Sequence, residues 1–376
     1  MKKVSFLFAM VLAATFAMAQ NTATTTQTGN QNEATVTQTG SNAATVVQTG
    51  DLNDAAVTQK GSTNVGTITE IGNSNTGVID QLNGDKNTGS ITQTGDLNQA
   101  YVTQGMVANY QGQTSSNVPG TENKATVVQT GNSNIVGGFI QVGVKNVGSV
   151  AQNGLSNLAY AYQGWAYGFW GETSITSALS STNSTVSISQ IQDNNQSAVW
   201  QYGGDKNAAT ISQDGDANLA RIAQGFIYTD APYNFRNPVY NTKNNTATIT
   251  QTGDGNAAKL FQLGDGNSFT LTQTGDGNKV GVAAGGLLEV RNGYFEQDGN
   301  ANIFVGSQTG DGATLDNTSR QTGNDNYINM VQEDGDVAKI IQEGNLNDVF
   351  LTQLGGGQNA TILQTGNSNV ATVTQQ

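Results

Sequence analysis

Small apolar and polar residues alternate along this chain in a pattern that recurs about every eleven residues. In the stretch QTGNQNEATVTQ (27–38), every second residue from Asn32 onward is Asn, Ala, Val and then Gln. In an extended strand these residues share one face, because successive side chains point to opposite sides. The Gly and polar residues before Asn32 fit a tight arc, since Gly, Asn and Asp tolerate positive φ. Each unit is therefore predicted to be one strand and one arc.

The unit recurs along nearly the whole chain, and the Gln that closes one copy opens the next. Of 28 such anchors between Gln27 and Gln375, 26 are Gln, and one exception is Glu70. A regular short period is typical of repeat folds whose units bury their inner faces against their neighbours. Two units placed back to back return the chain to its starting edge. We therefore predict an all-β fold, a β-solenoid of about 14 rungs, roughly 65 Å long, with two strands per rung and two facing parallel sheets.

Half of the residues on the predicted inner face are amides, which is unusual for a protein core. A buried amide costs about 1–3 kcal/mol unless it is hydrogen-bonded. Stacked in register at the strand spacing of about 4.8 Å, each Gln or Asn can donate to one neighbouring rung and accept from the other, as in amyloid. The predicted ladder includes Gln27, Gly29, Asn32, Gln38, Gln48, Asn53, Gln93, Asn98, Gln213, Asn218, Gln251, Asn256, Gln364, Asn369 and Gln375.

The first 19 residues are typical of a secretory signal peptide. Lys2 and Lys3 precede a short apolar run, and Ala17-Met18-Ala19 offers a small-residue cleavage site. The apolar run is shorter than the roughly 20 residues that a membrane span requires, which disfavours an anchor. We expect residues 20–376 to be exported as a single repeat domain without a membrane span.

Composition argues against several kinds of activity. The chain has no Cys and no His, so thiolate chemistry and the commonest general base and transition-metal ligand are missing. Removing Lys2 and Lys3 changes the formal charge from −13 to −15, which disfavours nucleic acid as a partner. Acidic residues are scattered without a fixed pair of the kind that glycosidases use. We therefore expect neither an enzyme nor a bound cofactor.

Three intervals between anchors are much longer than eleven residues and predict loop insertions near 105–121, 164–182 and 225–243. All three Pro residues of the chain lie in them, as expected because Pro removes a donor from a stacked strand. The loops begin four units apart, after Gln104, Gln163 and Gln224, so they should leave the same edge on every second rung. A weaker fourth insertion is expected near Ala284. The aromatic residues of the second and third loops include Trp165, Tyr167, Phe169, Trp170, Tyr228, Tyr233, Phe235 and Tyr240.

Several interpretations stay open at this point. The aromatic loops could bind glycans or cell surfaces, or could only cover an edge of the solenoid. The Gly-Asp-Gly-Asn arcs at 253–256, 264–267 and 275–278 could hold calcium, although turn preference alone explains them. Outward Thr residues such as Thr35, Thr37, Thr45 and Thr58 could form an ice-binding face, but Thr is also an ordinary strand residue.

The repeated Q-x-G-x-x-N-x-A-x-V-x-Q, as in QTGDLNQAYVTQ (93–104), resembles the curlin repeat of bacterial curli fibre subunits. The resemblance extends from about residue 21 to 376. It implies a subunit that is exported unfolded and assembles outside the cell into amyloid fibres for biofilm matrix and adhesion. It also implies a nucleating minor subunit and an outer-membrane secretion pore as partners. The stacking family positions correspond to residues such as Gln27, Asn32, Gln48 and Asn53.

The sequence therefore predicts the structural subunit of an extracellular curli-like fibre, a homopolymer that grows by head-to-tail β-stacking. The alternative is a secreted monomeric β-solenoid, an adhesin or ligand-binding protein that uses its aromatic loops. Residues 20–50 contain one charged residue, Glu33, and none follows Asp348. Charge and Pro usually protect exposed strand edges, so we expect both ends to be open to stacking.

Overall fold

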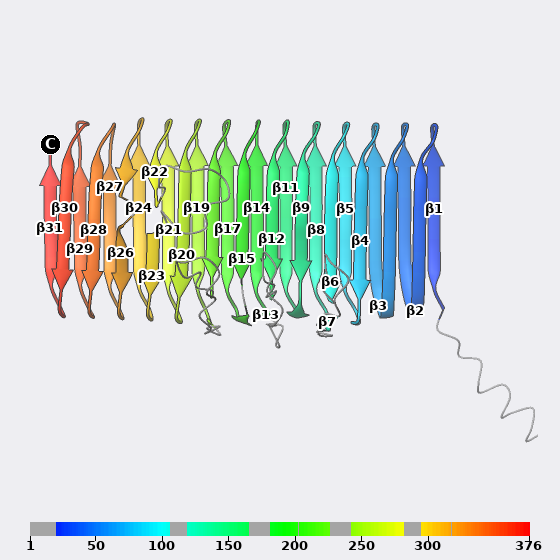
Figure 1. The fold of residues 1–376 in the computed structure, drawn as a ribbon, viewed down its shortest axis with the longest axis horizontal. Helices are drawn as coiled ribbons and strands as arrows, with labels where there is room; N and C mark the ends of the chain where they lie inside the picture. The colour runs from blue at the N-terminus through cyan, green and yellow to red at the C-terminus, as the bar shows by residue number, and fades with distance from the viewer. Residues whose placement is uncertain are drawn as a thin grey trace, which may run out of the picture.

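The structure is a computed structural model that describes residues 20–105, 119–164, 181–201, 203–225, 242–281, 295–316 and 318–376. Within these ranges every regular element is a β-strand, which confirms the predicted all-β fold. Figure 1 shows the strands side by side along one long axis, from β1 (Thr22–Thr28) at one end to β31 (Val370–Gln375) at the other.

Two series of parallel pairings alternate along the chain, and we name them the first and second ladders. The long strands β2 (Glu33–Thr49) and β3 (Asp54–Ile71) run through a turn and pair in both ladders, so that hydrogen bonds join 27 strands into one sheet. The first ladder contains β1, the later halves of β2 and β3, β5 (Thr88–Thr94), β8 (Lys124–Thr130), β11 (Val147–Asn153), β14 (Thr185–Ile191), β17 (Ala208–Asp214), β19 (Thr246–Thr252), β21 (Ser268–Thr274), β24 (Ile303–Thr309), β27 (Tyr327–Gln332), β29 (Asp348–Gln353) and β31.

The second ladder is built from the strands that alternate with these. It contains the first halves of β2 and β3, β4 (Thr76–Leu82), β6 (Gln99–Gly105), β9 (Ile135–Gln141), β12 (Leu158–Gln163), β15 (Gln196–Gln201), β18 (Leu219–Gln224), β20 (Ala257–Leu263), β22 (Lys279–Val280), β23 (Phe295–Asp298), β25 (Thr314–Leu315), β26 (Arg320–Thr322), β28 (Val337–Glu343) and β30 (Asn359–Thr365). In almost every pairing each anchor Gln lies beside the anchor of the next strand, as the eleven-residue period predicts.

A small sheet that the repeat pattern did not predict joins four successive turns, each of which follows a second-ladder strand. It consists of β7 (Gly120–Thr121), β10 (Gly143–Val144), β13 (Ser181–Thr182) and β16 (Gly204–Asp205), which pair in parallel. Asp205 continues this sheet with a bridge to Lys243. Residues 120, 181 and 243 follow the three long intervals in the sequence, so the chain re-enters the repeat through this sheet.

Inward side chains of both ladders contribute to one hydrophobic core. Alternating Ala, Val, Ile and Leu side chains form one buried cluster from Ala44 to Ile362. The core also holds Phe139, Phe269, Phe295 and Phe304, which are larger than the predicted Ala and Val. Nearby glycines provide the space: a Cβ on Gly148, in the other ladder, would lie 2.4 Å from the Phe139 ring, and a Cβ on Gly306, two residues after Phe304 in β24, would lie 2.5 Å from the Phe304 ring.

Regular parallel pairing with one shared core confirms the prediction of a β-solenoid. The total of about 14 rungs and the layout as two facing sheets stay predictions, since parts of the chain lie outside the described residues. The signal peptide and the aromatic loop residues Trp165, Tyr167, Phe169, Trp170, Tyr228, Tyr233, Phe235 and Tyr240 lie outside them as well.

Candidate functional site: amide columns and their edges

Each ladder carries a column of Gln side chains along its inner face. In the second ladder Gln38 Nε2 donates to Gln59 Oε1 at 2.8 Å, and the same bond repeats from anchor to anchor up to Gln364. Every bond has the same direction, from Nε2 of one anchor to Oε1 of the next one along the chain. The column therefore has a donor end and an acceptor end.

The second hydrogen of each amide ties the two ladders together. Gln213 Nε2, for example, donates to Gln251 Oε1 at 2.9 Å and also to the backbone carbonyl of Gln196 at 3.2 Å. Gln213 belongs to the first ladder and Gln196 to the second. Both hydrogens on Gln213 Nε2 are thus donated, as a buried amide requires. Leu, which has no donor or acceptor in its side chain, could replace none of these bonds.

Asn side chains form similar columns in the arcs. We call the arcs that follow first-ladder strands the first edge, and those that follow second-ladder strands the second edge. At the first edge Asn53 Nδ2 donates to the Gly72 carbonyl at 2.8 Å, and its Oδ1 accepts from the backbone N–H of Asn75 at 3.1 Å. Each Asn therefore joins its own arc to the next arc by hydrogen bonds.

Most anchors are followed two residues later by a Gly, and at Gly29 the stacking of the arcs requires it. Gly29 has φ = 118°, and a Cβ there would lie 1.9 Å from the Gly50 carbonyl oxygen of the next arc. Any other residue would push the two arcs apart. The arc residue two positions later also has positive φ, and in several arcs it is not Gly: Leu52 and Leu97 both have φ = 60°.

The structure places the predicted ladder residues as follows. Gln27, Gln48, Gln93, Gln213, Gln251 and Gln375 lie in the first-ladder column, and Gln38 and Gln364 lie in the second. Asn32, Asn53, Asn98, Asn218 and Asn256 lie in the first-edge column with Gly29, and Asn369 lies in the second-edge column.

One carboxyl group interrupts the first-ladder column. Glu70 occupies an anchor position between Gln48 and Gln93, and its side chain is fully buried. Gln48 Nε2 donates to Glu70 Oε2 at 2.9 Å, which continues the column on one side. On the other side Glu70 Oε1 and Gln93 Oε1 are both buried without a hydrogen-bond partner among the described residues. Burial raises the pKa of Glu70 from 4.5 to about 8.

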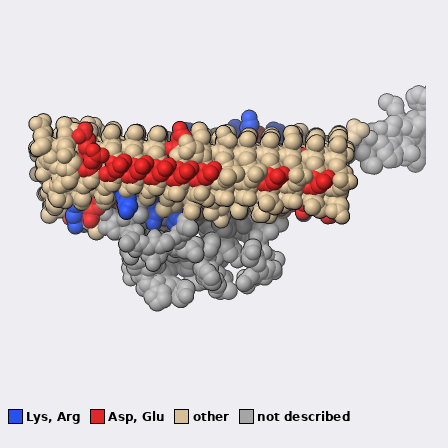
Figure 2. Space-filling model, turned by 90° about the horizontal axis from the view of Figure 1, so that it is seen from above, with Lys and Arg blue, Asp and Glu red and all other residues tan. Residues whose placement is uncertain are grey.

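Acidic side chains form a row along the first edge (Figure 2). In consecutive arcs the backbone N–H of one Asp donates to Oδ1 of the next, at 2.7–2.9 Å. The row, which we call the Asp column, consists of Asp193, Asp216, Asp254, Asp276, Asp311 and Asp334. Asn73 and Asn132 have the same role in earlier arcs and accept from the N–H of Asp51 and Asp96.

Two of the three Gly-Asp-Gly-Asn arcs, 253–256 and 275–278, supply members of the Asp column, whereas Asp265 of the third arc lies at the second edge and accepts from the N–H of Lys243 at 2.8 Å. Asp254 Oδ1 accepts from the N–H of Asp216, and Gly255 occupies the arc position with positive φ, at 64°. Gly at this position removes the strain that Leu52 and Leu97 carry. Within the described part of the chain, no group of three or more His, Cys, Asp or Glu residues is placed to hold a metal ion.

The second edge differs from the first because the long intervals of the sequence open there. The anchors Gln104, Gln163 and Gln224 lie in the second-ladder column and alternate with Gln141 and Gln201. All three long intervals therefore start from the same edge, at alternate anchors.

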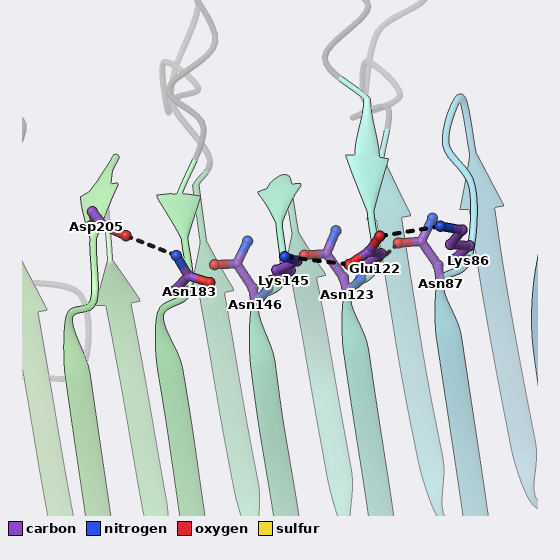
Figure 3. Close-up of polar contacts among 8 residues, drawn as sticks. All are labelled: Lys86, Asn87, Glu122, Asn123, Lys145, Asn146, Asn183 and Asp205. Atoms are coloured by element: carbon purple, nitrogen blue, oxygen red, sulfur yellow. Dashed lines mark hydrogen bonds and ion pairs between the residues drawn. The ribbon is translucent and has the colours of Figure 1, made fainter.

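Ion pairs lie on the outer side of this edge (Figure 3). Glu122 lies between Lys86 and Lys145, with N–O distances of 3.4 and 3.8 Å, and Asn183 Nδ2 donates to Asp205 at 3.1 Å. The lysine and glutamate side chains are between one third and two thirds exposed, so these pairs contribute little to stability. Beneath them Asn87, Asn123 and Asn146 continue the Asn column.

A search for membrane-spanning helices finds none in the ranges that the structure describes. The comparison with curated proteins and the comparison with solved structures both find no match. The family model of the curlin associated repeat matches four regions of the chain, residues 20–50, 84–110, 242–283 and 344–376. These regions include both ends of the solenoid and two stretches between them. These four regions of the chain are therefore similar to the curlin associated repeat.

Proposed function

We propose that this protein is the structural subunit of an extracellular fibre, in which the ladders of one copy continue into the next. The curlin-repeat family supports a curli-type fibre subunit, and the amino-terminal leader pattern supports export. In the fibre the protein would serve biofilm matrix and surface adhesion. A nucleating minor subunit and an outer-membrane pore are the partners that the family suggests.

The observation that carries this proposal is the chemistry of the two terminal strands. Gln27 of β1 donates to Gln48 at 2.7 Å, but no described amide donates to Gln27 Oε1. At the other end Gln375 accepts from Gln353 at 2.8 Å, and no strand among the described residues lies beyond it. One end thus offers acceptors and the other donors. A second copy can supply what each end lacks.

The backbone and the side chains of these strands are open in the same way. β1 pairs with β2 alone and β31 with β29 alone among the described strands. All seven residues of β1 are exposed, whereas the corresponding inner residues of β2 are buried. An unpaired strand edge without charge is a template for further strands.

A pair of lysines on the inner face of β31 tests the proposal. Ala371 and Val373 pack against the core cluster, so Ala371→Lys with Val373→Lys places charge where the next strand must stack. The matched control is Thr372→Lys with Thr374→Lys, which puts the same charge on the exposed face of the same strand. We expect the inward variant to elongate at least tenfold more slowly and to cap wild-type fibres, while the control elongates.

Elongation is measured by seeded thioflavin fluorescence and by electron microscopy of fibre length. Equal elongation rates for the inward variant and the wild type would show that growth does not use this end. Adhesion through the aromatic loops is a separate prediction, because residues such as Trp165 and Trp170 lie outside the described part. Trp165→Ala with Trp170→Ala should leave fibre formation unchanged and reduce binding to glycan-coated surfaces.

A further inference from the structure

The series of side-chain hydrogen bonds in the first-ladder column is interrupted once, between Glu70 and Gln93. These residues are direct neighbours in the register of β3 and β5. Elsewhere in the column an Nε2 donates to the following Oε1, as Gln93 does to Gln129 at 2.8 Å. Here no such bond forms: Glu70 Oε1 and Gln93 Oε1 lie 3.0 and 3.6 Å from the point that a Cβ on Gly77 would occupy. Neither accepts a hydrogen bond of ordinary geometry among the described residues. The nearby backbone N–H of Gly77 lowers the pKa of Glu70 by less than burial raises it.

A proton on Glu70 removes this conflict. A protonated carboxyl has one O–H donor and one carbonyl acceptor, the same pair of functions that an anchor Gln supplies to the column. Glu70 Oε2 already accepts from Gln48 at 2.9 Å, so a hydrogen on Oε1 can be donated to Gln93 Oε1. The ionised form leaves two buried oxygens facing each other and a negative charge inside the core.

The charged groups around Glu70 do not compensate an ionised carboxylate. Asp54, at the start of the same strand, is negative and raises the pKa of Glu70 further. The charged residue of β2 is Glu33, that of β4 is Asp80, and β5 carries none. Lys60 of β3 lies in the second-ladder half of the strand, paired beside Thr39 at the opposite edge. Within the described strands, no cation faces the carboxyl.

We infer that Glu70 is a proton-binding site of the folded protein, so that formation of this part of the solenoid takes up one proton from solution. The unfolded chain has an ordinary exposed Glu, which is ionised at neutral pH. Folding at neutral pH must therefore protonate it. Acidification favours the folded solenoid at this rung, and alkaline conditions oppose it. The inference concerns folding of the single chain and does not depend on the proposed fibre.

Proton uptake during folding measures the site directly. The full chain is diluted from denaturant into unbuffered solution at pH 6.5, and the acid needed to hold the pH is recorded per mole of protein. We expect the wild type to take up about one proton more than Glu70→Gln, which supplies the amide that other anchors have. Glu33→Gln, at an exposed position, is the control and should behave like the wild type. Equal uptake by wild type and Glu70→Gln would overturn the inference.

The complementary test introduces a carboxyl group at another anchor position. Gln213 is a fully buried anchor with the same hydrogen bonds as its neighbours. Gln213→Glu should add one proton to the uptake, and its folding equilibrium should weaken roughly tenfold per pH unit above about pH 5. If Gln213→Glu folds without extra uptake, an anchor position does not force protonation and the inference is wrong.

Discussion

The two Gln columns have the same geometry and differ at one position. From Gln38 to Gln364 the second-ladder column is an unbroken series of Nε2-to-Oε1 bonds, all between 2.7 and 3.2 Å. The first-ladder column has the same series with Glu70 inserted near its amino-terminal end. The comparison shows that each anchor position must supply one hydrogen-bond donor and one acceptor to its two neighbours in the column. An amide provides both at any pH, whereas a carboxyl provides both only with a proton.

Removing both functions from an anchor should have the largest effect. Gln213→Leu leaves Gln190 Nε2 without its acceptor at 2.9 Å and Gln251 Oε1 without its donor at 2.9 Å. Two buried unsatisfied groups cost about 1–3 kcal/mol each, so the free energy of unfolding should fall by about 2–6 kcal/mol. Urea unfolding followed by circular dichroism measures it.

The control for this variant is Gln196→Leu, on the outward side of β15 and outside both columns. It should change the free energy of unfolding by less than about 0.5 kcal/mol. Equal losses for the two variants would mean that the columns have no special role in stability.

The difference between the columns should also appear as a pH dependence. The pKa of Glu70 is about 8 in the folded protein and 4.5 in the unfolded chain. A raised carboxyl pKa means that the folded state binds the proton more tightly, so its stabilising contribution is full below about pH 4.5. It is then lost at about 1.4 kcal/mol per pH unit as the pH rises toward 8.

The urea midpoint of the wild type should therefore fall between pH 5 and pH 8. Glu70→Gln should remove most of that slope and should be more stable than the wild type at pH 7. A slope that survives Glu70→Gln unchanged would assign the pH dependence to other carboxyl groups, such as Asp80, whose pKa burial also raises.

Removing charge from the Asp column at the first edge should have a smaller effect on stability. The Asp column repeats a negative charge at about the strand spacing of 4.8 Å, well within the Debye length of about 10 Å at 0.1 M salt. Asp254→Asn with Asp276→Asn keeps the Oδ1 acceptors and removes two charges, as Asn73 and Asn132 do naturally. We expect a higher melting temperature at low salt and little difference from wild type in 1 M salt. A gain that is independent of salt would contradict an electrostatic origin.

The smallest expected effect comes from the strained arc position. Leu97 is exposed and has φ = 60°, a conformation that costs an ordinary residue about 1 kcal/mol. Gly255 occupies the equivalent position and has open space around its Cα. Leu97→Gly should stabilise the protein by up to about 1 kcal/mol, measured by urea unfolding. The control Thr92→Gly, on the outward face of β5, should destabilise it.

The period of eleven residues was enough to predict the strands, the solenoid and the register of the anchors. This succeeded because a parallel in-register stack places like residues side by side, so that one consensus describes every contact. The positions of the three long intervals at one edge follow from the same counting. The direction of the amide bonds could not be predicted, because it depends on side-chain rotamers that the pattern does not specify.

Other features required the three-dimensional contacts. The small sheet β7, β10, β13 and β16 lies in arc residues with no strand periodicity, so its pairing could be found only in the structure. Phe139 and Phe304 break the small-residue pattern of the core. The compensating Gly148 lies on the other ladder from Phe139, whereas Gly306 lies two residues after Phe304 in the same strand. Glu70 was visible in the sequence as an exception among the anchors. The two buried oxygens without partners, Glu70 Oε1 and Gln93 Oε1, could be found only in the structure.

Whether copies join end to end is the central question, and fibre formation answers it most directly. The chain from residue 20 onward is diluted from denaturant and examined by electron microscopy and by X-ray diffraction of aligned samples. We predict unbranched fibres with a meridional reflection at about 4.7–4.8 Å, the spacing between stacked strands. A folded β-rich protein that stays monomeric in analytical ultracentrifugation at high concentration, and gives no fibres, would contradict this prediction.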